Sequence, residues 1–454
     1  MNRKFASTLL LAMAISGAAI AQDWKSLFDG KTLQGWKQVT GSAGFEVENG
    51  AIVGTTVHNS PNSFLLSDRH YGDFVLELEV MIEDSASNSG IQFRSRYDAA
   101  ANNGSGKVFG YQYELDPSAR MWTAGIYDEG RREWLYPLSL NPAAQTRLGT
   151  GRYNNVRIEC KGTETRTWIN NVPAAHLIDA VDTSGYIALQ VHSISRQQAA
   201  GKRIWWRNIR IKEGQFSFGD FPNDIYVVNT GINQLSDFEK KAGWKLLFDG
   251  TSSQGWKGAY KPGFPGKGWE IKNGELRVIP SGGAESANGG DIVTTGKYSA
   301  FDLSFEFKLE KAANSGVKYF VTLTENNEGS AIGLEYQLLD DTLHPDAKLG
   351  IAGNRTLASL YDLIKADKQP RFVRQPGNWN TARIVVFPDN RVIHYLNGVK
   401  VLEYVRGSQS FRDLVAISKY KIWEKFGEAP QGHILLQDHG DGVAFRSIKI
   451  RNLK

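Results

Sequence analysis

The amino-acid sequence predicts an all-β protein that consists of two similar β-sandwich domains in tandem. Three observations support this prediction: a long internal repeat, many segments in which apolar and polar residues alternate, and a near absence of sustained helical periodicity. Alternation with a period of two is typical of strands that bury one face. Strands separated by Gly-rich turns, without helices between them, favour antiparallel sheets packed face to face.

The internal repeat divides the chain near its middle. The segment WKSLFDGKTLQGW at 24–36 returns as WKLLFDGTSSQGW at 244–256, and FEVENGAI, NSGIQF and GYIALQVH return in the same order as WEIKNGEL, NSGVKY and GHILLQDH. Copies of this length are too long for solenoid units and fit two homologous domains. We expect these domains at 22–213 and 244–454, each with its own core, and a linker at 214–243.

Within each copy, the longest alternating segments are expected to be strands. They are FVLELEVMI at 74–82, NVRIECKG at 155–162, DLSFEFKLE at 302–310 and the hairpins of 383–404, which contain Asp-Asn and Asn-Gly turn signals. In the linker, Ser236 and Glu239 have the spacing of a capping box and predict one short helix that ends at Gly243.

Composition and charge exclude several classes of protein. The chain has 454 residues, of which 41% are hydrophobic, enough for packed cores in two or three domains. Its 53 basic and 48 acidic residues are interspersed and give a net charge of +5, so there is no basic stripe that would predict nucleic-acid binding. The single cysteine, Cys160, cannot form an internal disulfide and is expected in a core.

The first 21 residues have the features of a signal peptide. A positive start at 2–4 precedes an apolar stretch at 9–20, and Ala19-Ile20-Ala21 forms a small-x-small cleavage site before Gln22. No other stretch approaches the roughly 20 apolar residues that a membrane helix needs. We therefore expect an exported protein, periplasmic or secreted, without a membrane span.

A short strand-like stretch in each copy places polar residues on one face. In GYQYELDP at 110–117 the polar residues alternate with Tyr111, Tyr113 and Leu115, and GLEYQLLDD at 333–341 repeats the pattern. The polar set is Gln112, Glu114 and Asp116 in the first copy, and Glu335 and Gln337, followed by Asp340, in the second. This face is expected to be an open binding surface, and an ordinary exposed strand face is the alternative.

Several motifs of the second copy resemble a known bacterial family. WKLLFDG, NGEL, NSGVKY, GLEYQLLDDTLHPDA, SLYDLI, WNTARIVV and GHILLQDHGDGVAFRSIKI follow one another as in the 3-keto-disaccharide hydrolase family, formerly a domain of unknown function. The resemblance covers 244–454 and, in variant form, most of 23–213. It implies a concanavalin-like jelly-roll sandwich in each half. In the first copy LQVHS replaces LQDHG and the HPDA segment is missing, so equal function of the two halves is in doubt.

The resemblance also implies a reaction, the cleavage of glycosides whose sugar carries a ketone at C3. The ketone acidifies the proton at C2, a base removes it, the enolate expels the glycosidic oxygen from C1, and water can then add. Such a site needs a base, an electrophile near the ketone oxygen and an acid for the leaving group. A separate sugar 3-dehydrogenase is implied as a partner, because this chain has no dinucleotide-binding fingerprint.

Histidines and cations on the polar strands are the candidates for this chemistry. Histidine suits proton transfer at neutral pH, and His439 and His192 each follow a glutamine by two residues. A cation such as Lys318, or Arg94 in the corresponding strand, could stabilise an enolate oxygen. The candidate catalytic residues are His439, Glu335, Lys318, His192, Glu114 and Arg94.

Amide and aromatic side chains are the candidates for holding the sugar. Aromatic rings offer stacking planes, although core packing is the alternative for each of them. Arg120, Arg131 and Arg132, between the aromatic residues, could add planar hydrogen-bond donors. The candidate substrate-binding residues are Gln437, Gln337, Tyr361, Asp362, Gln112, Asp116, Trp122, Tyr127, Trp134 and Gln190.

Other interpretations of the same residues stay open. Glu335, Asp340 and His439 could hold a divalent metal ion, since carboxylate and imidazole ligands suit zinc or manganese, but their spacing is not a known metal motif. A tandem pair of carbohydrate-binding domains without catalysis, and a recognition scaffold without a sugar ligand, are the two alternatives to an enzyme.

Overall fold

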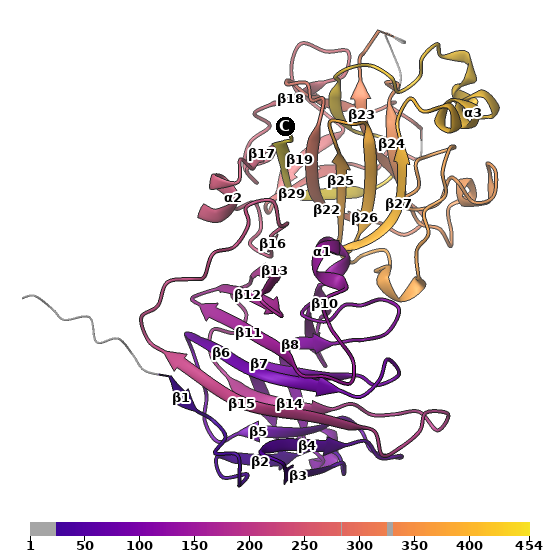
Figure 1. Ribbon diagram of the computed structural model, residues 1–454. Helices are drawn as coiled ribbons and strands as arrows, with labels where there is room; N and C mark the ends of the chain where they lie inside the picture. The colour runs from indigo at the N-terminus through magenta and orange to yellow at the C-terminus, as the bar shows by residue number, and fades with distance from the viewer. Residues whose placement is uncertain (1–23, 283, 325–329) are drawn as a thin grey trace, which may run out of the picture.

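The computed structural model describes residues 24–282, 284–324 and 330–454, and these form an almost entirely β structure (Figure 1). The prediction of an all-β chain with two tandem jelly-roll sandwiches is confirmed: each half of the chain builds two largely antiparallel sheets that pack on a common core. The expected signal peptide at 1–21 lies outside the described residues. Within those residues, no helix has the length and apolar character needed to cross a bilayer.

The first sandwich contains a nine-stranded and a seven-stranded sheet. The larger sheet has the spatial order β16 (Val228–Asn229), β13 (Val172–Ile178), β12 (Glu164–Ile169), β11 (Asn154–Lys161), β6 (Phe74–Ile82), β15 (Arg203–Glu213), β4 (Ala51–Thr55) and β3 (Gly44–Glu48), with β1 (Lys25–Ser26) paired to β15. The smaller sheet has the order β10 (Glu133–Tyr136), β9 (Ile126–Glu129), β8 (Lys107–Leu115), β7 (Ser89–Asp98), β14 (Tyr186–Val191), β5 (Ser63–Ser67) and β2 (Trp36–Val39).

The second sandwich contains an eight-stranded and a five-stranded sheet. The larger sheet has the order β19 (Trp269–Lys272), β20 (Glu275–Val278), β29 (Val443–Asn452), β22 (Phe301–Leu309), β25 (Asn380–Val386), β26 (Arg391–Leu396) and β27 (Val399–Val405), with β17 (Lys245–Leu246) paired to β29. The smaller sheet has the order β18 (Trp256–Gly258), β21 (Ile292–Thr294), β28 (His433–Leu436), β23 (Asn314–Val321) and β24 (Leu334–Leu339).

The predicted alternation on the two polar strands is present in the structure. In β8, Tyr111 and Tyr113 are buried in the core while Gln112 points to the other side of the sheet. In β24, Tyr336 is buried in the second core, and Glu335 and Gln337 lie on the opposite face. Period-two alternation therefore places the polar face of each half on the outside of its smaller sheet. Cys160 is fully buried in the first core, as expected.

The helices are short and lie in loops. They are α1 (Pro142–Gln145), α2 (Asp237–Lys241) and α3 (Gln409–Ile417), with 3-10 turns η1 (Asn102–Gly104), η2 (Leu138–Leu140), η3 (Pro345–Lys348), η4 (Pro370–Phe372) and η5 (Lys419–Ile422). Helix α3 was not predicted from the sequence. Its start is marked by Ser408, whose Oγ accepts a hydrogen bond from the amide of Phe411 at 3.2 Å.

The segment 214–243 is bound to both halves instead of forming a free tether. β16 pairs in parallel with β13 of the first sandwich. The predicted capping box of Ser236 and Glu239 begins α2, and the buried carboxylate of Glu239 also accepts a bond from Lys449 in β29 at 2.5 Å. The linker therefore connects an edge of the first large sheet with the central part of the second.

The two halves also contact each other directly. The apolar core of the first half extends to Val385, Ile393 and Tyr395 on β25 and β26, and the Trp122 and Phe372 rings have centroids 5.4 Å apart. Figure 1 shows α1 and β10 of the first half facing this end of the second sandwich. On the side of the second half, this contact uses β25 and β26 of the larger sheet.

Candidate active site

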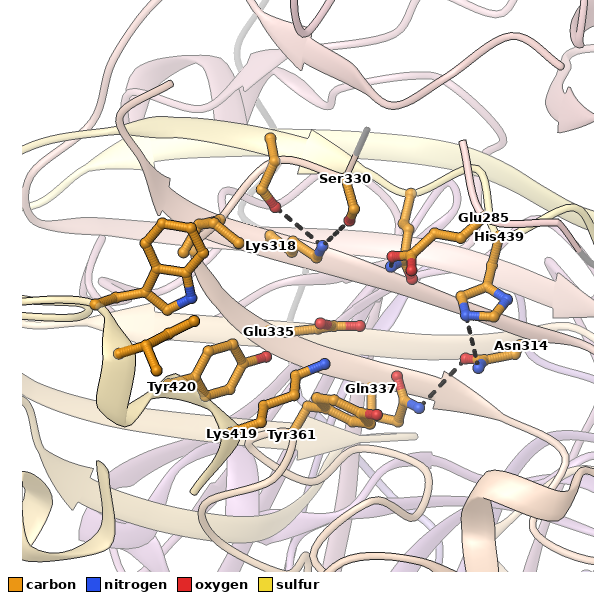
Figure 2. Close-up of a pocket in the computed structure, with 16 residues that line it drawn as sticks. Glu285, Asn314, Lys318, Ser330, Glu335, Gln337, Tyr361, Lys419, Tyr420 and His439 are labelled. Carbon is orange, nitrogen blue, oxygen red and sulfur yellow. Dashed lines mark hydrogen bonds between the residues drawn. The ribbon is translucent and has the colours of Figure 1, made fainter. Parts of the chain in front are cut away.

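Most of the predicted site residues of the second half line one pocket of about 330 Å³ on the outer face of the five-stranded sheet (Figure 2). The structure brings together Lys318, Glu335, Gln337, Tyr361, Gln437 and His439. It adds residues that sequence reasoning missed, among them Glu285, Asn314, Lys419, Tyr420, Ile422 and Trp423. The size of the pocket fits a small ligand such as a sugar ring.

The floor of the pocket is formed by two neighbouring strands. In the register of β23 and β24, Lys318 lies opposite Glu335 and Gly316 lies opposite Gln337. A Cβ atom on Gly316 would lie 2.2 Å from Oε1 of Glu335. The glycine of the NSG motif therefore leaves room for the Glu335 carboxylate above the sheet.

Glu335 is the central acid of the floor. Its side chain is 5% exposed, and this burial raises the pKa of the carboxyl above its usual range, while the ammonium groups of Lys318 and Lys419 oppose the shift. When the Gln337 amide is turned with its nitrogen toward Glu335, it donates to that carboxylate at 3.2 Å and to the carbonyl oxygen of Ser315 at 3.0 Å. The raised pKa makes Glu335 a stronger base than an ordinary carboxylate.

Lys318 is a buried cation on the same floor. Its Nζ donates to the Oγ of Ser330 at 2.6 Å and to the carbonyl oxygen of Ala331 at 3.0 Å. The carboxylate of Asp291 accepts from the amide of Ala331 at 3.2 Å and helps to hold that segment. An ammonium group has three N–H donors, so one is left without a partner among the described residues and can reach a ligand oxygen.

Glu285 enters the pocket on a loop that is tied to the end of β28. Gln437 donates from Nε2 to the Glu285 carboxylate at 2.9 Å. The Asp438 carboxylate accepts from the amides of Gly289 and Gly290, both at 2.9 Å, and the Asp438 carbonyl oxygen accepts from the amide of Ser286 at 2.7 Å. Burial alone would raise the pKa of Glu285, but the charge of Lys318, a hydrogen bond from Ser330 and the charge of Lys419 together outweigh it and hold that pKa below its usual value.

His439 lies at the same end of the pocket as Glu285. Its Nε2 is 3.3 Å from the amide nitrogen of Asn314, and its buried Nδ1 has no hydrogen-bond partner in the described part of the chain. The ring of His344, from the HPDA segment, meets it edge-on with centroids 6.2 Å apart. β28 ends at Leu436, so Gln437 and His439 follow the strand, yet both face the pocket as the sequence predicted.

Tyr361 and Lys419 form a further wall of the pocket. The hydroxyl of Tyr361 donates to Asp346 of the HPDA segment at 2.8 Å, and the ammonium of Lys419 lies 4.2 Å from the centre of the Tyr361 ring. Partial burial lowers the pKa of Lys419, and Glu335 opposes that shift. Lys419 was missed because it belongs to η5, a short turn without periodicity.

Two predicted site residues, Asp340 of the metal set and Asp362 of the substrate-binding set, do not line this pocket. The carboxylate of Asp340 accepts from the backbone amides of Ala312, Thr342 and Leu343 at 2.9 to 3.3 Å, as a turn former does. The prediction that Asp340 joins Glu335 and His439 at a metal is therefore wrong, and the described residues contain no other cluster of three such ligands. Asp362 does not line the pocket either, since it binds Arg355 and the backbone amide of Lys419, each at 2.7 Å.

The corresponding face of the first half carries different groups. In β7 and β8, Gln92 lies opposite Gln112 and Gly90 lies opposite Glu114. Gln92 therefore stands at the position of Lys318. Gln112 corresponds to Glu335 and Glu114 corresponds to Gln337, so the acid and the amide have exchanged places. Burial raises the pKa of Glu114 to about 7. Among the described residues of the first half, no buried lysine corresponds to Lys318.

The closing strand of the first half also differs. The imidazole Nδ1 of His192 is 2.6 Å from the carbonyl oxygen of Ser193, and the fully buried amide of Gln190 has no hydrogen-bond partner among the described residues. Phe64 and Val191 stand where the second half has Asp291 and Asp438. The carboxylates that hold the Glu285 loop are thus replaced by apolar residues.

Comparison with known proteins agrees with the motifs. Residues 23–212 and 243–451 each match the sequence profile of the 3-keto-alpha-glucoside-1,2-lyase-like domain. The chain belongs to this family.

A protein of Bacteroides thetaiotaomicron named 3-keto-disaccharide hydrolase is 37% identical over 232 residues, which cover 46% of this chain and 79% of that protein. A protein of Parabacteroides distasonis described as a candidate glycosyl hydrolase is 28% identical over 49% of this chain and 100% of its own, with a TM-score of 0.43. The resemblance found in the sequence is confirmed.

In the first 3-keto-alpha-glucoside-1,2-lyase-like domain, three predicted site residues are structural. Arg94 is 1% exposed and donates to the carbonyl oxygens of Gly72 and Gly162 and to Asp73 at 2.8 to 3.0 Å. Asp116 accepts from the amide of Ser118 at 3.2 Å and pairs with Arg120 in a turn. Trp122 is buried in the core. The predicted roles of these three at a sugar site are wrong.

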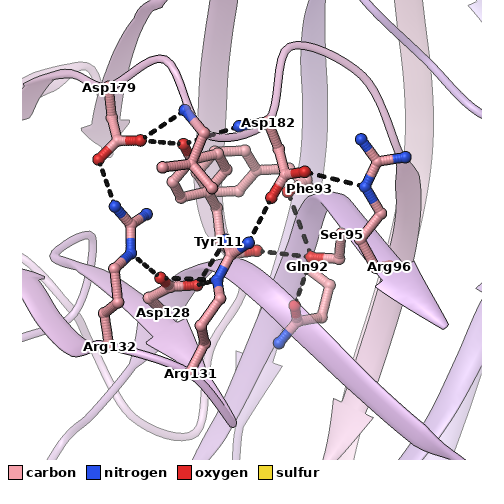
Figure 3. A network of polar contacts seen from close by, with 11 residues as sticks. Gln92, Phe93, Ser95, Arg96, Tyr111, Asp128, Arg131, Arg132, Asp179 and Asp182 are labelled. Carbon is pink, nitrogen blue, oxygen red and sulfur yellow. Dashed lines mark hydrogen bonds and ion pairs between the residues drawn. The ribbon is translucent and has the colours of Figure 1, made fainter. Parts of the chain in front are cut away.

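The arginines of the same domain are engaged in a polar network (Figure 3). Arg131 pairs with Asp128 and with Asp182, at 2.8 Å to the latter, and Arg132 pairs with Asp128 and with Asp179. The hydroxyl of Tyr111 donates to Asp179 at 2.6 Å. The interpretation of Arg131 and Arg132 as sugar ligands is therefore not supported. Tyr127 and Trp134 are half-buried, with ring centroids 5.3 Å apart, and remain accessible.

Proposed function

We propose that this chain cleaves 3-keto-glycosides, including 3-keto-disaccharides, and that its second half carries the chemistry. The observation that carries this proposal is the position of the Glu335 carboxylate on the pocket floor, opposite Lys318 in the strand register and with Lys419 on the wall. A buried base next to cations is what abstraction of an acidic C–H requires, because the cations stabilise the enolate that forms. The match of both halves to a family named for a 3-keto-glucoside lyase supports the same reaction.

The first chemical step is elimination. Glu335 takes the C2 proton, and the N–H of Lys318 that faces the pocket donates to the ketone oxygen as it becomes an enolate. The enolate then reforms the C3 ketone, a double bond forms between C1 and C2, and the C1–O bond breaks. The leaving oxygen takes one proton from Lys419, whose lowered pKa suits it as an acid.

The second step decides between a hydrolase and a lyase outcome. Water adds to C1 of the unsaturated ketone, its second proton passes to the neutral amine of Lys419, and the proton held by Glu335 returns to C2, which gives the free 3-keto-sugar and restores both groups. Release of the unsaturated ketone before water adds would make the same site a lyase. In either outcome a separate sugar 3-dehydrogenase must supply the ketone, and a periplasmic or secreted location fits the N-terminal sequence.

Glu335 is favoured over His439 as the base because of their positions. The carboxylate lies between the two ammonium groups (Figure 2), whereas His439 lies at one end, with its Nε2 beside Asn314. A base remote from both cations would form the enolate without electrostatic support. We assign His439, with Asn314 and Glu285, to binding of sugar hydroxyls.

The decisive experiment compares a 3-keto-glycoside with its unoxidised parent. The ketone acidifies the C2 proton, and the parent lacks it, so only the 3-keto compound is expected to release its leaving group. Product release should be followed by chromatography with both substrates at equal concentration. Equal turnover of the parent would contradict the proposal, and binding of both without turnover would support a carbohydrate-binding pair.

A further inference from the structure

The pocket of the second half has a polar end and an aromatic end. Glu285, Asn314 and His439 gather at one end, whereas Tyr420, Ile422 and Trp423 line the other. Figure 2 shows Tyr420 and His439 on opposite sides of Glu335. A ligand that spans the pocket therefore meets hydrogen-bonding groups on one side of the reacting carbons and mostly carbon atoms on the other.

The aromatic end of the pocket is held in place by contacts within the protein. Ser418 caps the 3-10 turn that carries Tyr420, since its Oγ accepts from the amide of Tyr420 at 3.0 Å. The Tyr420 ring stacks on Phe426 with centroids 4.0 Å apart and an angle of 11° between the planes. The wall is thus fixed before a ligand arrives.

Ile422 is apolar and open to water at this end. It is 73% exposed, the highest value among the exposed large apolar side chains of the described residues, and it lines the same pocket as Glu335. Ile332 lines the pocket as well. An exposed apolar side chain at the mouth of a site gains stability when a ligand with an apolar surface covers it.

We propose that the leaving group held at this end is an apolar aglycone, such as an aryl or alkyl group, in preference to a second sugar. This inference rests on the proposed function. The 3-keto-sugar has hydroxyls that match the polar end, so its C1 and the group attached there point toward Lys419 and the aromatic wall. A ring can stack on Trp423, but Ile332 and Ile422 offer no hydrogen bonds to the hydroxyls of a second sugar.

The test compares two substrates of the same anomeric configuration, a 3-keto phenyl glucoside and a 3-keto-disaccharide. The phenyl compound is expected to have a kcat/KM about 10-fold higher or more, in the range that an apolar contact provides. The Ile422→Ser variant should lower kcat/KM for the phenyl compound more than for the disaccharide, and so reduce this advantage. Val181→Ser, at a 52% exposed apolar residue of the first half, is the matched control and should change neither value.

Equal or better cleavage of the disaccharide, or an equal loss on both substrates in Ile422→Ser, would overturn the proposal. Failure of the proposed function is distinguishable, because neither 3-keto compound would then be cleaved. In that case calorimetric titration with phenyl glucoside and with an unoxidised disaccharide decides the question. Tighter binding of the phenyl compound that is lost in Ile422→Ser would support the apolar subsite, and equal binding would refute it.

Discussion

Glu335 and Lys419 together determine the pH dependence expected of the reaction. Glu335 must be deprotonated to act as the base, and burial raises its pKa, so the rate should fall on acidification at a pH above that of an ordinary carboxylate. Lys419 must be protonated to act as the acid, and its pKa is lowered, so the rate should also fall on the alkaline side before an ordinary lysine titrates.

The Glu335→Gln variant tests this assignment. Because the amide cannot accept the proton, kcat should fall about 10²-fold or more, and the acidic limb of the pH profile should disappear. His439→Ala is the matched comparison, and it should mainly raise KM. A variant of Glu335 that keeps the wild-type kcat, or an acidic limb that disappears only in His439→Ala, would show that the base is a different residue.

At the scale of elements, the side chain of Asp438, just after β28, helps to hold the loop that carries Glu285. Removing the Asp438 carboxylate by Asp438→Ala would leave the amides of Gly289 and Gly290 without an acceptor. Each buried unpaired group costs about 1–3 kcal/mol, so the loop should loosen and Glu285 should lose its position. We expect KM to rise about 10-fold with a smaller change in kcat.

Asp249→Ala provides the control for this loop. Asp249 also accepts from two backbone amides, those of Thr251 and Ser252, both at 2.7 Å, but it lies in an exposed turn outside the pocket. Its loss should leave KM unchanged. Asp438→Asn retains an acceptor oxygen and should restore part of the affinity, whereas equal KM values for Asp438→Ala and the wild type would remove the loop from substrate binding.

The elements also show where sequence reasoning succeeds and where it stops. Alternation around Tyr336 placed Glu335 on the polar face, because a regular strand keeps its phase. Arg94 was misplaced because β7 has a bulge between Gln92 and Arg96, and Arg94 itself has a φ of 48°. A period-two pattern cannot show such a break, so the side chain of Arg94 turned away from the face that Gln92 occupies.

Loop residues account for most of what was missed at the site. Glu285 and Lys419 lie in segments that have no strand periodicity, and they reach the pocket only through contacts distant in the sequence. Asp340 shows the converse problem. A carboxylate after a strand can be a metal ligand or a turn former, and only its bonds to backbone amides decide between the two.

For the whole molecule, we predict that the two halves are unequally active. In the first half, Gln92 occupies the position that Lys318 has in the second. An enolate formed in the first half would therefore lack the buried cation. In the full-length chain, His439→Ala should weaken cleavage of a 3-keto-glycoside, whereas His192→Ala should change kcat/KM less than about twofold. The two histidines occupy matching positions and serve as controls for each other. A greater loss in His192→Ala would assign the activity to the first half.

This comparison uses the full chain because the halves are not separate in their packing. Separating the halves would expose Val385, Ile393 and Tyr395, which pack into the core of the first half. A loss of activity in an isolated half could then reflect lost stability instead of a missing catalytic group.

The position of the last strand in each half bears on how the chain is made. β15, the last long strand of the first half, lies between β6 and β4, and β29 lies between β22 and β20, so a strand that comes late in each half fills the middle of its large sheet. Until that strand emerges from the ribosome, its neighbours have exposed edges and the sandwich cannot close. Folding of each half is therefore delayed until its central strand has been translated, and deletion of β29 would open the second large sheet in its interior.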